Sequence, residues 1–312
     1  MKNSQSINIL LAGICLFMLC TTNAQNGNEL LVYSLKGTVT VIEKDKESIV
    51  KIGKVLKPEV IIKMQKLAKL TMVCKEGKPL SITKEGIFPI VKWKDSCSIS
   101  DNSMTSKYFQ YIWDQLYVRS EDYKKEHPGE ADNNERIEAP VRGEKILEIN
   151  ICEELDTINF ATGIFTLSWS TNIDYTGKYY FVLRDIKSGK QVFTDSISGN
   201  SLLMGNLCKY MRPGNSYSWS VTAGKSGFSD ERIINYLSVR KINQEINKMK
   251  YLPDVSEEKA AQYFRLAYLL EKNYYLADAF TYYQKAVSAS PDIAFFQEKL
   301  IEFKKMFQMS SF

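Results

Sequence analysis

The sequence predicts a multidomain α+β protein: a small antiparallel β-domain, then a β-sandwich, then a C-terminal α-helical hairpin with a capping helix. Apolar and polar residues alternate with the period of a β-strand over residues 29–90 and again over 146–240. After residue 241 the apolar spacing changes to three and four residues, which is the period of an α-helix. The composition, with 44% apolar and 25% charged residues in 312, is that of an ordinary globular protein.

Six segments follow from these patterns. They are a leader (1–24), the β-domain (25–100), an amphipathic helix (101–118), a charged linker (119–145), the sandwich (146–240) and the helical module (241–312).

The first 24 residues have the features of a secretory signal peptide. Lys2 precedes a short apolar run, and small residues end at Ala24, where cleavage is expected. The run is shorter than the roughly 20 residues that a membrane span needs, so the mature chain is expected to have no transmembrane segment. We therefore predict export to the periplasm or outer cell envelope. Lipidation at Cys20 is the alternative, which Leu19 disfavours because a small residue is expected there.

Four cysteines remain in the mature chain, and an oxidising compartment favours their pairing. Four cysteines permit three connectivities. Because the segment boundaries separate them two and two, we predict the pairs Cys74–Cys97 and Cys152–Cys208. Buried free thiols are the alternative.

The β-domain is predicted from short strands that glycines separate. Thr38–Ile42 alternates polar with β-branched residues, Val60–Ile62 is a short buried run, and Gly37, Gly53 and Gly77 mark turns. The order of the segments 36–41, 52–56 and the strand pair around 76–78 resembles the FecR-like domain of bacterial envelope proteins. This resemblance implies a role in envelope signalling.

Residues 103–118 predict a helix with one aromatic and apolar face, which includes Tyr108, Ile112 and Trp113. We expect this face to pack on the β-domain; a groove-binding helix for a partner is the alternative. The following segment, 119–145, has 14 charged residues among 27 and is predicted to be a flexible linker. The only histidine, His127, lies in it, so we expect a solvated side chain there rather than a catalytic one.

The sandwich is predicted from strands that alternate large apolar residues with hydroxyl residues, as in 165–170 and 217–222. The run from Met211 to Tyr217, with Pro213 and Gly214, resembles the corner of fibronectin type III and related immunoglobulin-like domains. The resemblance implies that the Tyr217 hydroxyl locks this corner and that Trp169 is a core residue. The alternative is a sugar-stacking platform made by Trp169 and Trp219.

The C-terminal module carries the most specific pattern, which is similar to one tetratricopeptide repeat beginning at Ala260. The residues that match its core spacing are Tyr263, Leu266, Ala267, Leu270, Ala279, Tyr283, Ala286 and Pro291. A third helix after Asp292 is expected to cap the pair. The resemblance implies a concave face lined by Ala261, Phe264, Tyr268 and Lys272, which would bind an apolar peptide or a second copy of the chain.

The sequence lacks the residues that several classes of function need. One histidine cannot build a zinc site of two or three His ligands, and no calcium-loop motif is present. The segment Gly224–Ser226 matches only the end of a phosphate-binding loop, because Trp219 occupies the position of the first glycine. We predict no enzyme activity, no cofactor and no metal.

Lysine is concentrated in residues 36–95, with 14 lysines, 7 acidic residues and no arginine. Such a face is expected to be an ordinary solubilising surface; attraction of anionic polymers is the alternative, for which export disfavours nucleic acid. The leading hypothesis is a non-enzymatic, exported modular binding or scaffold protein that recognises another envelope protein or a polyanionic polymer. The alternatives are a FecR-like sensor and a glycan-acting hydrolase with Trp169 or Trp219 in its cleft.

Overall fold

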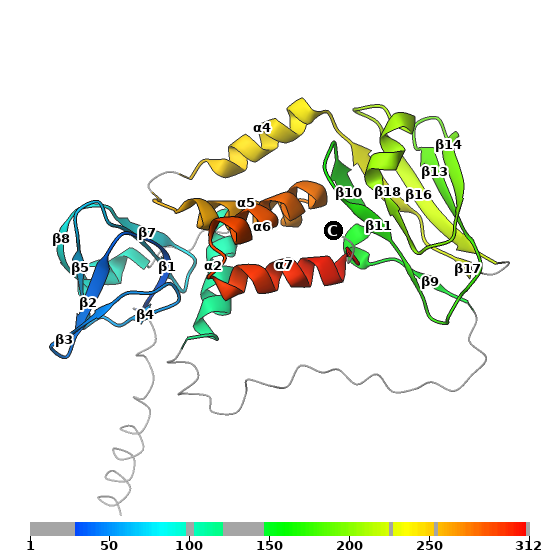
Figure 1. Cartoon of the computed structure of the whole chain (residues 1–312). Helices are drawn as coiled ribbons and strands as arrows, with labels where there is room; N and C mark the ends of the chain where they lie inside the picture. Colours follow the sequence, from blue (N-terminus) through cyan, green and yellow to red (C-terminus); the bar gives the residue numbers. More distant parts are fainter. Residues whose placement is uncertain (1–28, 98–102, 121–146, 225–226, 253–254, 310–312) are drawn as a thin grey trace, which may run out of the picture.

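The protein is a mixed α and β structure, and its computed structural model describes residues 29–97, 103–120, 147–224, 227–252 and 255–309. The leader with Cys20, the segment with His127 and part of the Gly224–Ser226 motif lie outside the described residues. Figure 1 shows a helical layer between two β-structures, which are formed by the N-terminal strands and by strands β9 to β18.

The N-terminal part folds into two four-stranded antiparallel sheets, with the strand orders β4-β1-β6-β7 and β3-β2-β5-β8. Their bounds are β1 Leu30–Lys36, β2 Val39–Glu43, β3 Lys46–Ile49, β4 Val55–Leu56, β5 Ile61–Met64, β6 Lys69–Cys74, β7 Pro79–Ile82 and β8 Gly86–Pro89, followed by the 3-10 helix η1 Ile90–Cys97. Buried aliphatic residues fill the space between the sheets, as the alternating pattern predicts.

Strand β1 is buried on both of its faces. Leu30 and Val32 point into the core of the β-structure, whereas Leu31 and Tyr33 belong to a second core shared with the helices. A strand covered on both sides has a continuous apolar run instead of alternation, and the sequence of β1 begins in this way. The N-terminal β-structure therefore does not pack as an isolated unit.

Helix α2 (Met104–Tyr117) covers that second face of β1 and β6 and also packs on α5. The Ser103 side chain caps it by accepting a hydrogen bond from the N–H of Ser106, at 3.0 Å. Gly77, in the β6–β7 turn, lies against this helix with a φ of +83°, and a Cβ there would lie only 2.3 Å from the Ser106 carbonyl oxygen. The turn can approach the helix this closely only because residue 77 is glycine.

Cys74 and Cys97 form a disulfide with a Cα–Cα distance of 5.7 Å, so this pairing agrees with the prediction. The predicted Cys152–Cys208 pair is wrong in this structure, where both thiols are free. Cys152 precedes a short helix and donates to the Glu154 carboxylate at 2.7 Å, whereas Cys208 lies in another helix beside the Met204 carbonyl oxygen. Each sulfur therefore has its own local partner instead of the other sulfur.

The second β-structure contains a six-stranded sheet of order β10-β18-β16-β13-β14, with β17 paired to β16, and two two-stranded sheets, β11–β15 and β9–β12. The pair β10–β18 is parallel and the other pairs are antiparallel. The bounds are β9 Ile149–Asn150, η2 Glu153–Leu155, β10 Thr157–Phe160, β11 Thr166–Ser168, β12 Ser170–Thr171, β13 Tyr179–Asp185, β14 Gln191–Ile197, β15 Ser201–Leu203, η3 Met204–Tyr210, β16 Ser216–Ala223, β17 Gly227–Phe228 and β18 Arg232–Tyr236.

Trp169 and Trp219 are core residues of this second β-structure. They are 0% and 1% exposed, and both rings lie near Phe181. As predicted, the Tyr217 hydroxyl accepts a hydrogen bond from the backbone of the turn before it, from the Arg212 N–H at 2.7 Å. Both tryptophans point into the core because residues two apart on a strand share one face.

Four helices follow: α4 Val239–Lys250, α5 Lys259–Lys272, α6 Leu276–Ala289 and α7 Ala294–Met306. Helices α5 and α6 make the most extensive contact between elements, and buried Ala267 and Ala279 allow their close approach. The α5–α6 turn docks on β10, where the Asn159 N–H donates to the Tyr274 carbonyl oxygen at 2.9 Å. The end of α7 contacts β11 through Phe307 and Phe165. Their rings belong to one core that extends from Leu31 to Met309.

Candidate functional site

The predicted concave face of the repeat is filled by the chain itself. Phe264 is 0% exposed and stacks on Phe296 of α7, with 4.6 Å between the ring centroids. Tyr268 is 7% exposed and stacks on Tyr111 of α2 at 4.8 Å. Helices α2 and α7 thus occupy the surface that the repeat pattern predicts for a peptide or for a second copy of the chain. The assignment of Phe264 and Tyr268 as groove residues is therefore wrong.

The other residues of the predicted face divide between the core and the surface. Ala261 is buried, and its carbonyl oxygen accepts from the Tyr33 hydroxyl at 3.1 Å. Lys272 is exposed, with its ammonium 5.6 Å from the centre of the Tyr268 ring. Among the residues with core spacing, Leu266, Ala267, Leu270, Ala279, Tyr283 and Ala286 are buried, Tyr263 is half-buried and Pro291 is exposed.

A sugar platform or hydrolase cleft at Trp169 and Trp219 is also excluded, because neither ring reaches the surface.

The acidic residue Glu154 acts on the neighbouring thiol of Cys152. Burial, followed by the hydrogen bond to Glu154, raises the pKa of the Cys152 thiol to about 11, and the same hydrogen bond lowers the pKa of Glu154. Such a thiol stays protonated near neutral pH and is a poor nucleophile.

A buried ion pair joins α5 to the segment before it. The Arg265 Nη2 lies 2.7 Å from Glu257 Oε2, and its Nε lies 2.9 Å from Oε1. The side chains are 1% and 4% exposed. Two further guanidinium contacts reach the carbonyl oxygens of Met249, at 2.8 Å, and Lys250, at 3.3 Å. The guanidinium therefore holds the end of α4 and the start of α5 together.

Two tyrosines connect this pair to the N-terminal β-structure. The Tyr33 hydroxyl of β1 lies 2.9 Å from Glu257 Oε1 and 2.9 Å from the Tyr108 hydroxyl of α2. Burial, reinforced by the charge of Glu257, raises the pKa of both tyrosines well above its ordinary value, so both keep their protons. Burial alone lowers the pKa of Arg265, but its bonds to Glu257 raise it overall. We name Tyr33, Tyr108, Glu257 and Arg265 the polar clasp.

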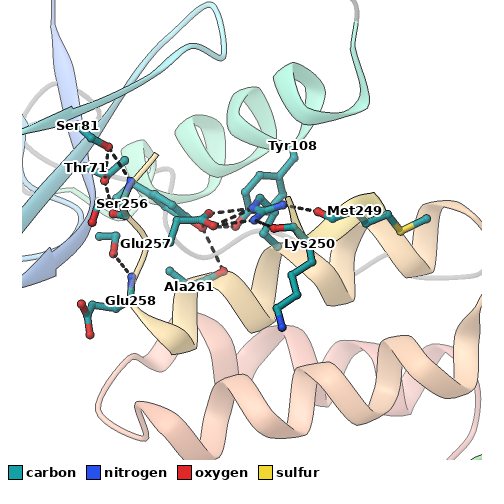
Figure 2. Close-up of polar contacts among 12 residues, drawn as sticks. Thr71, Ser81, Tyr108, Met249, Lys250, Ser256, Glu257, Glu258 and Ala261 are labelled. Atoms are coloured by element: carbon teal, nitrogen blue, oxygen red, sulfur yellow. Dashed lines mark hydrogen bonds and ion pairs between the residues drawn. The ribbon is translucent and has the colours of Figure 1, made fainter. Parts of the chain in front are cut away.

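The segment that carries Glu257 also lies across the strands. The Ser256 N–H donates to Ser81 Oγ at 3.0 Å, the Ser256 carbonyl oxygen accepts from Thr71, and the Glu258 N–H donates to Ser34 Oγ at 3.0 Å. Figure 2 shows Ser256 next to Thr71 and Ser81 of the strands, and Glu257 between them and Tyr108. The clasp is buried and its groups are paired with one another. It is therefore suited to fixing β1, α2 and α5 to one another rather than to chemistry on a substrate.

The sequence patterns do not predict the clasp. By its position, Glu257 is only a favourable acidic residue near a helix start, and no motif includes Arg265. The available signal is the run Phe264-Arg265-Leu266, in which a charged residue interrupts an apolar helix face. An arginine at such a position needs a buried partner, but the sequence does not identify that partner.

A second polar cluster lies between α5, α6 and α7. Tyr283 donates to Glu271 Oε2 at 2.5 Å, and Lys299 Nζ lies 3.6 Å from Glu271 Oε1. Burial, followed by the charge of Glu271, raises the pKa of Tyr283 well above its usual range. This cluster is also paired within itself, so it supports helix packing.

Asp278, in the first turn of α6, is a half-buried carboxylate whose Oδ2 atom is itself buried. Its Oδ2 has no hydrogen-bond partner among the described residues. Burial raises its pKa to about 6, against weaker opposing effects of its own backbone N–H and of Lys285. The carboxylate is therefore partly protonated in mildly acidic solution.

We expect Asp278→Asn to stabilise the protein at neutral pH. A folded-state pKa above the unfolded value means that the folded state binds the proton more tightly. In the wild-type protein, the stability that comes from this tightly bound proton is therefore complete below pH 3.8 and is lost as the pH rises through about 6, whereas asparagine stays neutral throughout. Urea unfolding should show the variant more stable by about 1–2 kcal/mol at pH 7.5, after allowance for partial exposure, and no more stable at pH 3.5.

The control is Asp174→Asn, which changes an exposed aspartate and should alter the free energy of unfolding by less than about 0.5 kcal/mol at both pH values. An equal stability gain at both pH values would show that the carboxylate charge at Asp278 is not the cause.

A groove of about 1020 Å³ lies where the N-terminal β-structure meets the helices. We name it the junction groove. It is lined by residues 49–55 and 57, by Leu35 and Glu43, by the end of α2 with Leu116, Arg119 and Ser120, and by Ser290 and residues 292–295. Its size is close to the upper limit for ligand sites. No sequence pattern predicts this groove, because its walls come from three separate parts of the chain.

The rim of the junction groove is basic. Lys51, Lys54, Lys57 and Arg119 line it, against the acidic residues Glu43 and Asp292. Lys54 lies 3.9 Å from Glu43, and Arg119 pairs with Glu298 at 2.6 Å. Among the described residues, Lys51 and Lys57 have no acidic partner within 4.0 Å. Part of the lysine excess of residues 36–95 therefore lies at this groove.

Metal binding has no support from the described residues. The only group of suitably close ligand atoms there consists of Cys74, Glu76 and Cys97. Both sulfurs of that group are joined in the disulfide and cannot act as thiolate ligands.

No protein-family model matches the chain, and a search of curated proteins finds no significant match. Within the described part of the chain, no helix is both long and apolar enough to cross a membrane.

Proposed function

We propose that this chain is a non-enzymatic, exported binding protein of the bacterial cell envelope, and that the junction groove is its ligand site. The FecR-like, immunoglobulin-like and tetratricopeptide-like assignments of its three parts belong to this proposal. The observation that carries it is a groove of about 1020 Å³ whose rim holds two lysines without an acidic partner among the described residues. The polar clasp supports it, because it fixes the β-structure and the helices that form opposite walls.

The ligand that fits this groove is an extended acidic segment of another protein. Lysines at positions 51, 54 and 57 attract carboxylates, while Ile52 and Phe295 provide apolar surface in the same groove. Strand β4, at residues 55–56, is the edge of its sheet, and an edge strand can pair with an added peptide strand. A purely polyanionic polymer would use the lysines but not the apolar lining or the strand edge.

The test is fluorescence anisotropy with a labelled peptide that alternates Glu with Val or Leu. We expect the wild-type protein to bind it, and Lys51→Ala/Lys57→Ala to weaken binding about tenfold, since each exposed charge contributes about 0.5–1 kcal/mol. Affinity should also fall as salt is added. The matched control is Lys66→Ala/Lys69→Ala, which removes two exposed lysines outside the groove and should leave affinity unchanged.

Dextran sulfate and a peptide with Lys in place of Glu complete the experiment. Binding of dextran sulfate without binding of the acidic peptide would replace the proposed ligand with a polyanionic polymer. Equal binding of the acidic and basic peptides, or equal loss in both double variants, would refute the groove as a specific site.

A further inference from the structure

The outer face of the six-stranded sheet presents aromatic and hydroxyl side chains to solvent. Alternation points Phe181, Leu183, Trp219 and Val221 into the core, so their neighbours on β13 and β16 point away from it. The outward residues of β16 carry hydroxyl groups, and a large aromatic residue lies at each side of this strand, one on β13 and one on β17. In Figure 1 this sheet lies at the side of the molecule away from the N-terminal strands.

The two aromatic residues are Tyr180 on β13 and Phe228 on β17, which are 51% and 65% exposed. Both are register partners of Thr222 on the strand between them, so all three lie on one row across the sheet. Ser196 on β14 extends the row beyond Tyr180. The two rings are separated by two strand spacings, about 10 Å, with the Thr222 hydroxyl between them.

Hydroxyl groups also lie on β16 at the residues that precede Thr222. Ser218 and Ser220 point to the same face, and neither of these hydroxyls nor that of Thr222 has a protein hydrogen-bond partner among the described residues. They are partly exposed to solvent. A hydroxyl can donate one hydrogen bond and accept two, so this column offers unused bonding capacity.

Charge on this face is balanced. Arg184 and Glu231 form an ion pair at 3.2 Å, and the remaining outward residues described on β13 and β16 are uncharged. The face therefore attracts neither a polyanion nor a polycation. It is also not a continuous apolar patch, because serine and threonine separate the exposed apolar side chains, which disfavours a second protein copy or a lipid surface.

We propose that this outer sheet face binds a neutral polysaccharide. A sugar ring has apolar C–H surfaces, which stack on aromatic rings, and a rim of hydroxyls, which exchange hydrogen bonds with serine and threonine. Two exposed rings flanking a hydroxyl column match both properties along one extended glycan. The site is separate from the junction groove and does not depend on the function proposed for it.

Affinity electrophoresis in native gels that contain β-glucan, mannan or xyloglucan tests this proposal. We expect at least one of these neutral polymers to retard the wild-type protein. Tyr180→Ala and Phe228→Ala should each weaken the affinity about tenfold, because each removes one aromatic stacking contact with the sugar. Tyr180→Phe and Phe228→Tyr keep the rings and should retain binding. Tyr251→Ala removes a ring that is 77% exposed elsewhere and should have no effect.

A further variant keeps both rings and blocks the space between them. Thr222→Arg places a long charged side chain in the row and should abolish retardation, while thermal unfolding shows whether each variant is folded. The proposal is overturned by no retardation in any of the three polymers. It is equally overturned by unchanged retardation of the alanine and Thr222→Arg variants, or by self-association that Tyr180→Ala abolishes in analytical ultracentrifugation.

Discussion

Replacing Arg265 with methionine is expected to lower the free energy of unfolding by about 3–5 kcal/mol, because it leaves a buried charge without its partner. Methionine fills similar space but leaves the Glu257 carboxylate buried, where its side chain is 4% exposed. The carbonyl oxygens of Met249 and Lys250 lose their guanidinium donors as well. Unfolding in guanidinium chloride, followed by circular dichroism, measures the loss.

A double variant separates the buried charge from the lost packing. Arg265→Met/Glu257→Gln leaves no unpaired charge, so it should recover at least about 2 kcal/mol relative to Arg265→Met. Tyr33→Phe removes only one hydroxyl of the clasp and should cost about 1–2 kcal/mol. A loss below about 1 kcal/mol for Arg265→Met would mean that the clasp does not hold the helices against the strands.

The second large effect is expected for Phe264→Ala, with a loss of about 3–5 kcal/mol. Phe264 is fully buried, and its ring contacts Tyr283, Phe295 and Phe296 of the two following helices. Removing the ring leaves a cavity that these rigid neighbours cannot close. Thermal and denaturant unfolding measure this loss.

This expectation differs from that for a binding residue on an open surface, whose replacement would change affinity and leave stability within about 0.5 kcal/mol. Lys272→Ala is the control from the same predicted face, because Lys272 is exposed and its removal should be nearly neutral. A stable Phe264→Ala protein that had lost a partner would restore the assignment of Phe264 to a binding groove.

The contrast between Phe264 and Lys272 shows where sequence reasoning fails. The spacing of the repeat correctly places both residues on one face of α5, since that depends only on the helical period. Whether that face is open depends on what packs against it. Helix α2, about 150 residues earlier in the chain, covers one part of it, and no local pattern encodes such a contact.

The cysteines also show that sequence patterns do not predict which side chains meet. Cys74 and Cys97 lie within one β-structure, whose strands and following helix bring them to a Cα–Cα distance of 5.7 Å. Cys152 and Cys208 also lie within one predicted domain, but sharing a domain does not fix which side chains meet. The exposed rings of Tyr180 and Phe228 escape prediction because the sequence shows alternation but not strand order.

By itself, the sequence determined the local structure of this protein: the strand segments on both sides of the charged region, the helices that follow them and the inward position of Trp169 and Trp219. These follow from periods of 2.0 and 3.6 residues, which are properties of neighbouring residues in the backbone. The tertiary structure decided the clasp, the filled repeat face, the junction groove and the exposed sheet face. Each of these depends on contacts between segments far apart in the chain, which only the packing of complementary surfaces selects.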